Sequence, residues 1–233
     1  MKMLNVNING NKKLQNTDNV RYMIWNLPAV KTCPFRTPSC EKSCYARKAE
    51  GVYPQVLPSR EQNYTDSLEN DFVSNMIYTI EKRLNSKAFE GKKVVFRIHE
   101  SGDFYNVEYT RKWIEIVKHF EHDARIVFIA YTKSIEYFIG CGYGRTCLPR
   151  DSSTDFPTNI VIRSSLWNDT KQKYVDLTKV YSFPIYTALS PDDMETARKN
   201  GKQFAECTCE NCSTCGKCWS RAECNKNIIV KIH

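Results

Sequence analysis

Four short runs rich in apolar and β-branched residues follow one another through the chain, and the gaps between them are long enough for helices. The runs cover residues 94–98, 125–130, 159–163 and 181–186. Such runs are typical of strands buried on both faces of a parallel sheet. Residues 66–84, opened by a capping box at Asp66 and Glu69, and residues 106–120, opened by Asn106, have the periodicity of amphipathic helices. The sequence therefore predicts an α/β fold.

Repeated strands and helices with right-handed crossovers form either an open doubly wound sheet or a barrel, and these patterns do not separate the two. In both, functional residues gather at the carboxyl ends of the strands. Residues 141–157 are rich in Gly, Arg, Ser, Asp and Pro and are predicted to form a long surface loop or lid. The composition then shifts to cysteine, so we expect an α/β domain over residues 1–203 and a small cysteine-rich module with a terminal strand over 204–233.

Length and composition indicate a soluble protein with a substantial core, since 41% of the 233 residues are hydrophobic. We find neither an apolar stretch long enough to span a bilayer nor a secretion signal, so we expect a cytoplasmic location and no membrane partner. The net charge of +8 is scattered along the chain. It fits a solvated surface better than an anionic partner such as nucleic acid.

The chain has 11 cysteines, and in a reducing cytoplasm closely spaced cysteines indicate metal rather than disulfides. Cys33, Cys40 and Cys44 form the first group and supply three soft ligands within one loop. Three thiolates on a [4Fe–4S] cubane would leave one iron open to a small molecule. The alternative is that these cysteines are buried or incidental thiols without metal.

A second group contains Cys212, Cys215 and Cys218, whose two-residue spacing is typical of ferredoxin loops around a [4Fe–4S] cluster. Cys207 or Cys224 would supply the fourth ligand, and Cys209 is the alternative. Zinc is the competing metal. The two cysteine groups could also meet in space and hold a single cluster, so the number of clusters stays open between one and two.

A family resemblance rests on two short motifs. The lead-in Tyr22-Met23-Ile24-Trp25, followed by a cysteine-rich loop ending in Cys44-Tyr45-Ala46, resembles the opening of radical SAM enzymes and, more closely, a set of bacteriophage proteins with radical-SAM-like cysteine loops. The resemblance implies a partial (β/α) barrel, a phage origin and S-adenosylmethionine as a ligand. Arg47 stands where the third cysteine of the usual motif would fall, so Cys33 would have to replace it.

Ser101-Gly102-Asp103 stands where radical SAM proteins carry the segment that binds the amino group of S-adenosylmethionine. The resemblance implies that Asp103 accepts from that amino group and that Ser101 and Gly102 let the backbone approach the ligand. From position alone, Glu100 and Asp103 are candidate acids or bases, and His99 is either a third or a hydrogen-bonded supporting residue. The ends of the next two predicted strands add a candidate catalytic residue, Lys133, and candidate cofactor-binding residues, namely Thr132, Arg163 and Ser165.

The favoured hypothesis is an iron–sulfur enzyme with radical-SAM-like chemistry on a small-molecule substrate, served by a reductase or ferredoxin. One alternative is a lyase or hydratase that uses the open iron as a Lewis acid, without S-adenosylmethionine, and that could release sulfide. The other alternative is a metal-stabilised nucleic-acid-binding module, in which aromatic and basic residues contact bases and phosphates.

Overall fold

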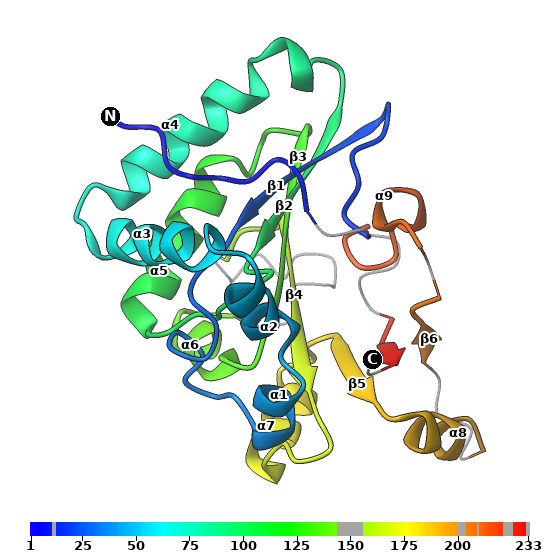
Figure 1. The fold of residues 1–233 in the computed structure, drawn as a ribbon. Helices are drawn as coiled ribbons and strands as arrows, with labels where there is room; N and C mark the ends of the chain where they lie inside the picture. The colour runs from blue at the N-terminus through cyan, green and yellow to red at the C-terminus, as the bar shows by residue number, and fades with distance from the viewer. Residues whose placement is uncertain (11–12, 144–155, 200–203, 209, 221–225, 232–233) are drawn as a thin grey trace.

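A computed structural model describes residues 1–233 except 11–12, 144–155, 200–203, 209, 221–225 and 232–233 (Figure 1). Within the described residues, seven strands form one parallel sheet in the order β1-β2-β3-β4-β5-β7-β6. The strands are β1 (Val20–Trp25), β2 (Lys93–Ile98), β3 (Ile126–Thr132), β4 (Ile160–Leu166), β5 (Ile185–Leu189), β6 (Ala205–Glu206) and β7 (Ile228–Lys231). The predicted α/β class is confirmed.

Helices connect the strands and lie beside them in chain order. They are α1 (Pro38–Lys42), α2 (Tyr45–Val52), α3 (Val56–Leu68), α4 (Phe72–Leu84), the 3-10 helix η1 (Lys87–Phe89), α5 (Val107–His119), α6 (Ile135–Gly140), α7 (Gln172–Val180), α8 (Pro191–Lys199) and α9 (Cys212–Cys215). Asn106 caps α5 as predicted, because its side chain accepts a hydrogen bond from the amide of Tyr109.

Two predicted boundaries are wrong. Asp66 lies inside α3 and does not open a helix, because its carboxylate accepts from Lys2 and Gln62. The strand expected from residue 181 begins only at Ile185, since Tyr181 ends α7 and Ser182 adopts a left-handed φ of 54°. In both places a tertiary or turn contact overrides the local pattern.

The sheet is open, and its first five strands are wound in one direction, whereas β7 turns back to lie between β5 and β6. Strands β1 to β5 lie side by side in chain order, so right-handed crossovers place their helices on one face. Figure 1 shows α3 to α6 on that face, which we call the helix side, and α9 on the opposite face, which we call the inner face. Among the described residues β1 and β6 are the two edge strands, with only an isolated bridge from Asn7 to Ile24 outside β1, so no closed barrel forms.

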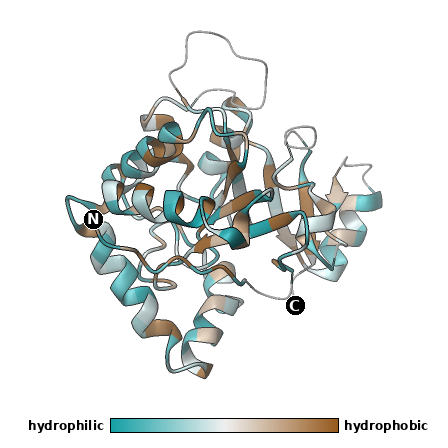
Figure 2. Cartoon of the chain, turned by 90° about the horizontal axis from the view of Figure 1, so that it is seen from above, coloured by the Kyte–Doolittle hydropathy of each residue, from teal (hydrophilic) through white to brown (hydrophobic). Residues whose placement is uncertain are grey.

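Alternate residues of each strand divide between the two faces. On β2, Phe96 and Ile98 enter the core on the helix side, where they meet Trp113 of α5 and similar side chains. Val95 faces the other way and joins an inner-face cluster with Tyr22, Ile24, Val127 and Ile129, against which Cys212, Cys218 and Trp219 pack. Figure 2 shows apolar residues on the central strands, whereas the surrounding helices carry both apolar and polar residues.

The C-terminal segment contributes directly to the sheet. Strand β7 inserts between β5 and β6. The amide of Cys212 donates to Lys13 O over 2.7 Å, and the Ser213 hydroxyl donates to Gln15 O, so α9 is joined to the segment before β1. Residues 200–203 are not among the described residues, so the domain boundary at 203/204 stays a prediction. The lid over residues 141–157 also stays a prediction, because most of its residues are not described. In the described part of the chain, no helix has the length and apolarity needed to cross a membrane.

Candidate metal and ligand site

The loop after β1 is fastened to the loop after β2 at the carboxyl edge of the sheet. Asn26 Oδ1 accepts from the amides of Glu100 and Ser101 over 2.8 and 2.9 Å, and the Ser101 hydroxyl donates to Leu27 O. Gly102 has a φ of 82°, and a Cβ there would lie 2.6 Å from Thr32 Oγ1 and 2.7 Å from Leu27 Cβ. Within the protein itself, this close approach of two loops already requires glycine.

Asp103 joins the loop after β2 to the end of β3. Its Oδ1 accepts from the Thr132 hydroxyl over 2.5 Å and from the Phe104 amide over 2.8 Å, and Oδ2 accepts from the Lys133 amide over 2.9 Å. Burial raises the pKa of this carboxyl, and the hydrogen bonds from Thr132 and Lys133 oppose that rise. A carboxylate has about four acceptor positions, so three donors leave one on Oδ2.

The three-cysteine loop lies over this edge. The pKa of the Cys33 thiol is raised to about 12, mainly by burial and next by the charge of Asp103, and the charge of Lys133 opposes this rise. Cys40 also acts on Cys33, which places these two cysteines, Asp103 and Lys133 in one electrostatic neighbourhood. Cys44 precedes α2 at its N-cap, and its side chain makes no capping hydrogen bond.

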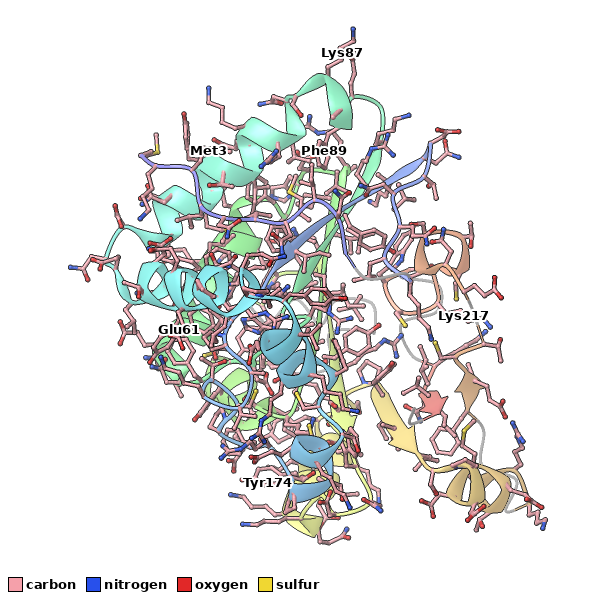
Figure 3. The ribbon with its side chains drawn as sticks, viewed as in Figure 1. Met3, Glu61, Lys87, Phe89, Tyr174 and Lys217 are labelled. Atoms are coloured by element: carbon pink, nitrogen blue, oxygen red, sulfur yellow. The ribbon has the colours of Figure 1, made fainter. Side chains whose placement is uncertain are left out.

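Aromatic contacts hold this loop against helices α6 and α7, which follow β3 and β4. The Phe35 ring lies 5.1 Å from Tyr137 of α6 and 5.4 Å from Tyr174 of α7, both edge-on. Figure 3 labels Tyr174 in the lower part of the molecule, near α1 in Figure 1. The Ser39 amide donates to Asp169 after β4 over 2.7 Å. The loop therefore extends across the carboxyl ends of β1 to β4.

Several residues predicted for the site meet here. The Lys133 ammonium donates to the Ser165 hydroxyl over 3.1 Å and lies 5.8 Å from the centre of the Trp167 ring. Together with the contacts of Asp103, these place the predicted Thr132, Lys133 and Ser165 in one group, whose Asp103 and Lys133 act electrostatically on Cys33. A cation, a carboxylate and hydroxyl groups at one edge of the sheet are suited to holding a polar ligand.

His99 does not join this group. Its φ of 62° interrupts the alternation of β2, and the side chain lies in the core on the helix side, 4.6 Å from Phe104 between ring centres. Trp25 donates to the Tyr109 hydroxyl, which shares a hydrogen bond of 2.9 Å with Nε2 of His99. Burial lowers the pKa of His99 to about 3. The structure therefore favours a supporting role over acid–base chemistry.

Glu100 lies at the rim, and its carbonyl accepts from the Tyr45 hydroxyl over 2.5 Å. Arg163, predicted to bind a cofactor, instead holds the C-terminal loop. Its Nε donates to Cys218 O over 3.0 Å, Nη1 to Lys226 O over 2.8 Å, and Nη2 to Lys217 O over 3.1 Å, with the side chain fully buried. Figure 3 labels Lys217 beside α9, across the molecule from Tyr174.

The C-terminal cysteines share a second neighbourhood on the inner face. The pKa of Cys212 is raised to about 11, mainly by burial and then by Cys218, Cys207 and Cys215, and Arg97 opposes this rise. The Lys13 ammonium lies 3.9 Å from Cys207 Sγ. Burial raises the pKa of Cys218, whereas a hydrogen bond from Tyr131 and the positive charges of Arg163 and Arg97 lower it. Cys224 and Cys209 lie outside the described residues.

Sequence reasoning missed four inner-face residues that lie between the two cysteine groups, namely Tyr45, Arg97, Tyr131 and Tyr186. The alternation of β2 carried a signal for Arg97, because a charged residue between Phe96 and Ile98 must face away from their core. The tyrosines carried no such signal, since aromatic residues are common throughout strands and helices.

Comparison with known proteins identifies relatives among phages. A model of the protein family described as Gene product 88 matches residues 2–221. Two curated proteins, each named Gene 88 protein, come from Mycobacterium phages D29 and L5, and each is 29% identical over 112 residues. These alignments cover 44% of this chain and 42% and 43% of the relatives, so the chain matches less than half of their length. No solved structure matches the chain.

Proposed function

This chain belongs to the Gene product 88 family, and within that family we propose that it is an iron–sulfur enzyme whose reacting centre lies over Cys33, Cys40 and Cys44. The observation that carries the proposal is that Cys33 lies within electrostatic range of Asp103 and Lys133, whose contacts join the loop after β2 to the end of β3 at the carboxyl edge of a parallel sheet. Thiols that serve only as packing residues have no need of a facing cation and carboxylate.

The donor set consists of three thiols within one loop, the ligand type that iron–sulfur clusters use. In the described part of the chain, no three His, Cys, Asp or Glu side chains converge on one point as a single metal ion requires. A cubane presents each thiolate with a different iron, so its ligands surround the cluster and do not meet at one ion. Cys33, Cys40 and Cys44 are free and only partly buried. The raised pKa of Cys33 means that metal would bind with release of a proton.

A bound cluster with an open iron supplies a coordination position and one-electron chemistry. The chain then orients the ligand. The remaining acceptor position on Asp103 Oδ2 suits an ammonium or amine donor, in keeping with the amino group of S-adenosylmethionine. Lys133, held by Ser165, presents a positive charge to a carboxylate of the ligand or substrate. An external reductase or ferredoxin would supply the electron.

We assign the C-terminal thiols of Cys207, Cys212, Cys215 and Cys218 to a second metal site. The positive charges of Lys13, Arg97 and Arg163 around them suit an anionic metal–thiolate group. Four thiolates hold either [4Fe–4S] or zinc, and Cys224 could replace one of them. Such a site would relay electrons or fix the loop against the inner face.

Metal analysis tests the proposal. The protein is purified without oxygen, and iron, acid-labile sulfide and zinc are measured for the wild type, the Cys33→Ala/Cys40→Ala/Cys44→Ala variant and a Cys141→Ala control. The wild type and the control should carry equal iron, and the triple variant should lose about four irons per chain. Zinc without iron in the wild type, or equal iron in all three proteins, would overturn the proposal.

Activity toward S-adenosylmethionine separates radical-SAM-like chemistry from Lewis-acid chemistry. The reconstituted protein is mixed with S-adenosylmethionine and dithionite, and 5′-deoxyadenosine and methionine are measured. Radical-SAM-like chemistry requires equal amounts of both products, dependent on the reductant, and a raised KM in Asp103→Asn. If a loaded cluster gives neither product, this chemistry is excluded.

A further inference from the structure

We propose that the inner face of the sheet carries an oxyanion-binding site organised by Arg97, which takes the carboxylate or phosphate group of a small molecule. The site lies below the carboxyl edge, between the two cysteine groups. The bound anion would be one group of the substrate of the proposed enzyme. Its assignment to a substrate rests on the proposed function, whereas the binding of the anion itself does not.

The backbone of β2 fixes the direction of Arg97. Its neighbours Phe96 and Ile98 are fully buried on the helix side, so Arg97 extends from the inner face. The guanidinium lies over the Tyr131 ring, 3.8 Å from its centre, and Nε donates to His99 O over 3.0 Å. Stacking and one hydrogen bond therefore hold the plane of the guanidinium in place.

The two terminal nitrogens of Arg97 are available to a ligand. Within the part of the chain that the structure describes, neither Nη atom has a hydrogen-bond acceptor or a carboxylate partner. The other inner-face cations differ, because Arg163 donates to three carbonyls and Lys133 donates to Ser165. A guanidinium held through Nε and open at both Nη atoms suits bidentate binding of an oxyanion.

Tyrosines surround this position. Tyr131 meets Tyr186 of β5 edge-on at 4.5 Å, and the positive charge of Arg97 acts on the hydroxyls of Tyr45 and Tyr186. The Tyr45 hydroxyl donates to Glu100 O over 2.5 Å, which fixes its position beside the end of β2. Neutral hydroxyl groups around a fixed cation favour a single anionic group with polar neighbours.

A competing explanation is that Arg97 only balances the charge of the C-terminal thiolates, since it lowers the pKa of Cys212 and Cys218 against burial. The two explanations differ in one respect. If Arg97 only balances the charge of the thiolates, a dissolved anion has no reason to shield its guanidinium from chemical modification. If Arg97 binds an anion, the bound anion must shield the guanidinium.

Chemical modification of the purified, metal-loaded protein tests the difference. Phenylglyoxal modifies accessible guanidinium groups, and peptide mass spectrometry gives the rate at Arg97 and at Arg125, an exposed arginine paired with Asp123. Inorganic phosphate in one arm and malonate in the other should slow modification at Arg97 about tenfold when each exceeds its Kd tenfold, and should leave Arg125 unchanged. The more protective anion identifies the group. Equal rates at Arg97 with and without both anions would overturn the proposal.

Calorimetric titration of the protective anion into variants gives a second test. Arg97→Gln should abolish binding, Arg97→Lys should weaken it because lysine lacks the two parallel donors, and Arg125→Gln should bind as the wild type does. A folded Arg97→Gln protein that binds normally would refute the site. The triple cysteine variant should keep this binding while losing iron, so the two proposals can fail separately. If Arg97→Gln does not fold, the protection experiment on the wild type still decides.

Discussion

The Thr132 hydroxyl donates to Asp103 Oδ1 over 2.5 Å, and this contact joins the end of β3 to the loop after β2. Both side chains are buried. The bond fixes the carboxyl group whose charge raises the pKa of Cys33.

Thr132→Val should therefore destabilise the fold by about 1–3 kcal/mol, because Asp103 would remain buried with one donor fewer. Urea unfolding measures the change. Thr65→Val, at an exposed position of α3, is the matched control. Its free energy of unfolding should stay within about 0.5 kcal/mol of the wild type. Equal effects of the two substitutions would show that the contact contributes nothing measurable.

His99 should make stability depend on pH. Its folded pKa is about 3 against an ordinary value of 6.5, so the unfolded chain binds more protons between these values and stability falls as pH falls through that window. The slope from this residue is at most about 1.4 kcal/mol per pH unit. Urea unfolding at several pH values should show a smaller slope in His99→Gln, whereas His119→Gln, at an exposed site, should keep the wild-type slope. Parallel curves for all three proteins would contradict this assignment.

Arg163→Lys should loosen the C-terminal loop although it preserves the charge. Lysine cannot reach three carbonyls with a planar fork, so buried acceptors would lose their donors at a cost of at least about 2 kcal/mol. Hydrogen exchange of the amides in residues 212–219 should accelerate, with metal lost from the C-terminal cysteines. Arg125→Lys is the control. Unchanged exchange in Arg163→Lys would show that other contacts hold the loop.

Cys33 should resist alkylation in the metal-free folded protein. A pKa near 12 in place of 9.0 leaves far less thiolate at pH 8, on the order of hundreds of times less. Iodoacetamide labelling followed by peptide mass spectrometry should show slow reaction in buffer and fast reaction in urea. Asp103→Asn should accelerate the folded-state reaction, because it removes a negative charge near the thiol. Rapid labelling of Cys33 in the folded wild type would disprove the assignment.

The strands and most helices could be predicted because their signals are local. Buried parallel strands are continuously apolar, and amphipathic helices repeat every turn, so β2, β3, β4 and α5 follow from short stretches of sequence. The extent of the sheet could not be predicted, because β7 inserts between β5 and β6 through pairing between distant segments.

The sequence by itself determined the α/β class, the spacing of the two cysteine groups and the polar residues that end β3 and β4. Only the tertiary structure decided which of these residues meet. His99 turns into the helix side through one left-handed backbone angle, and Arg163 reaches carbonyls more than fifty residues away. Arg97 acts electrostatically on both Tyr45, next to Cys44, and Cys218, because loops from both ends of the chain reach the same face of the sheet. Local patterns specify which residues are available, whereas side-chain partners depend on contacts between segments far apart in the chain.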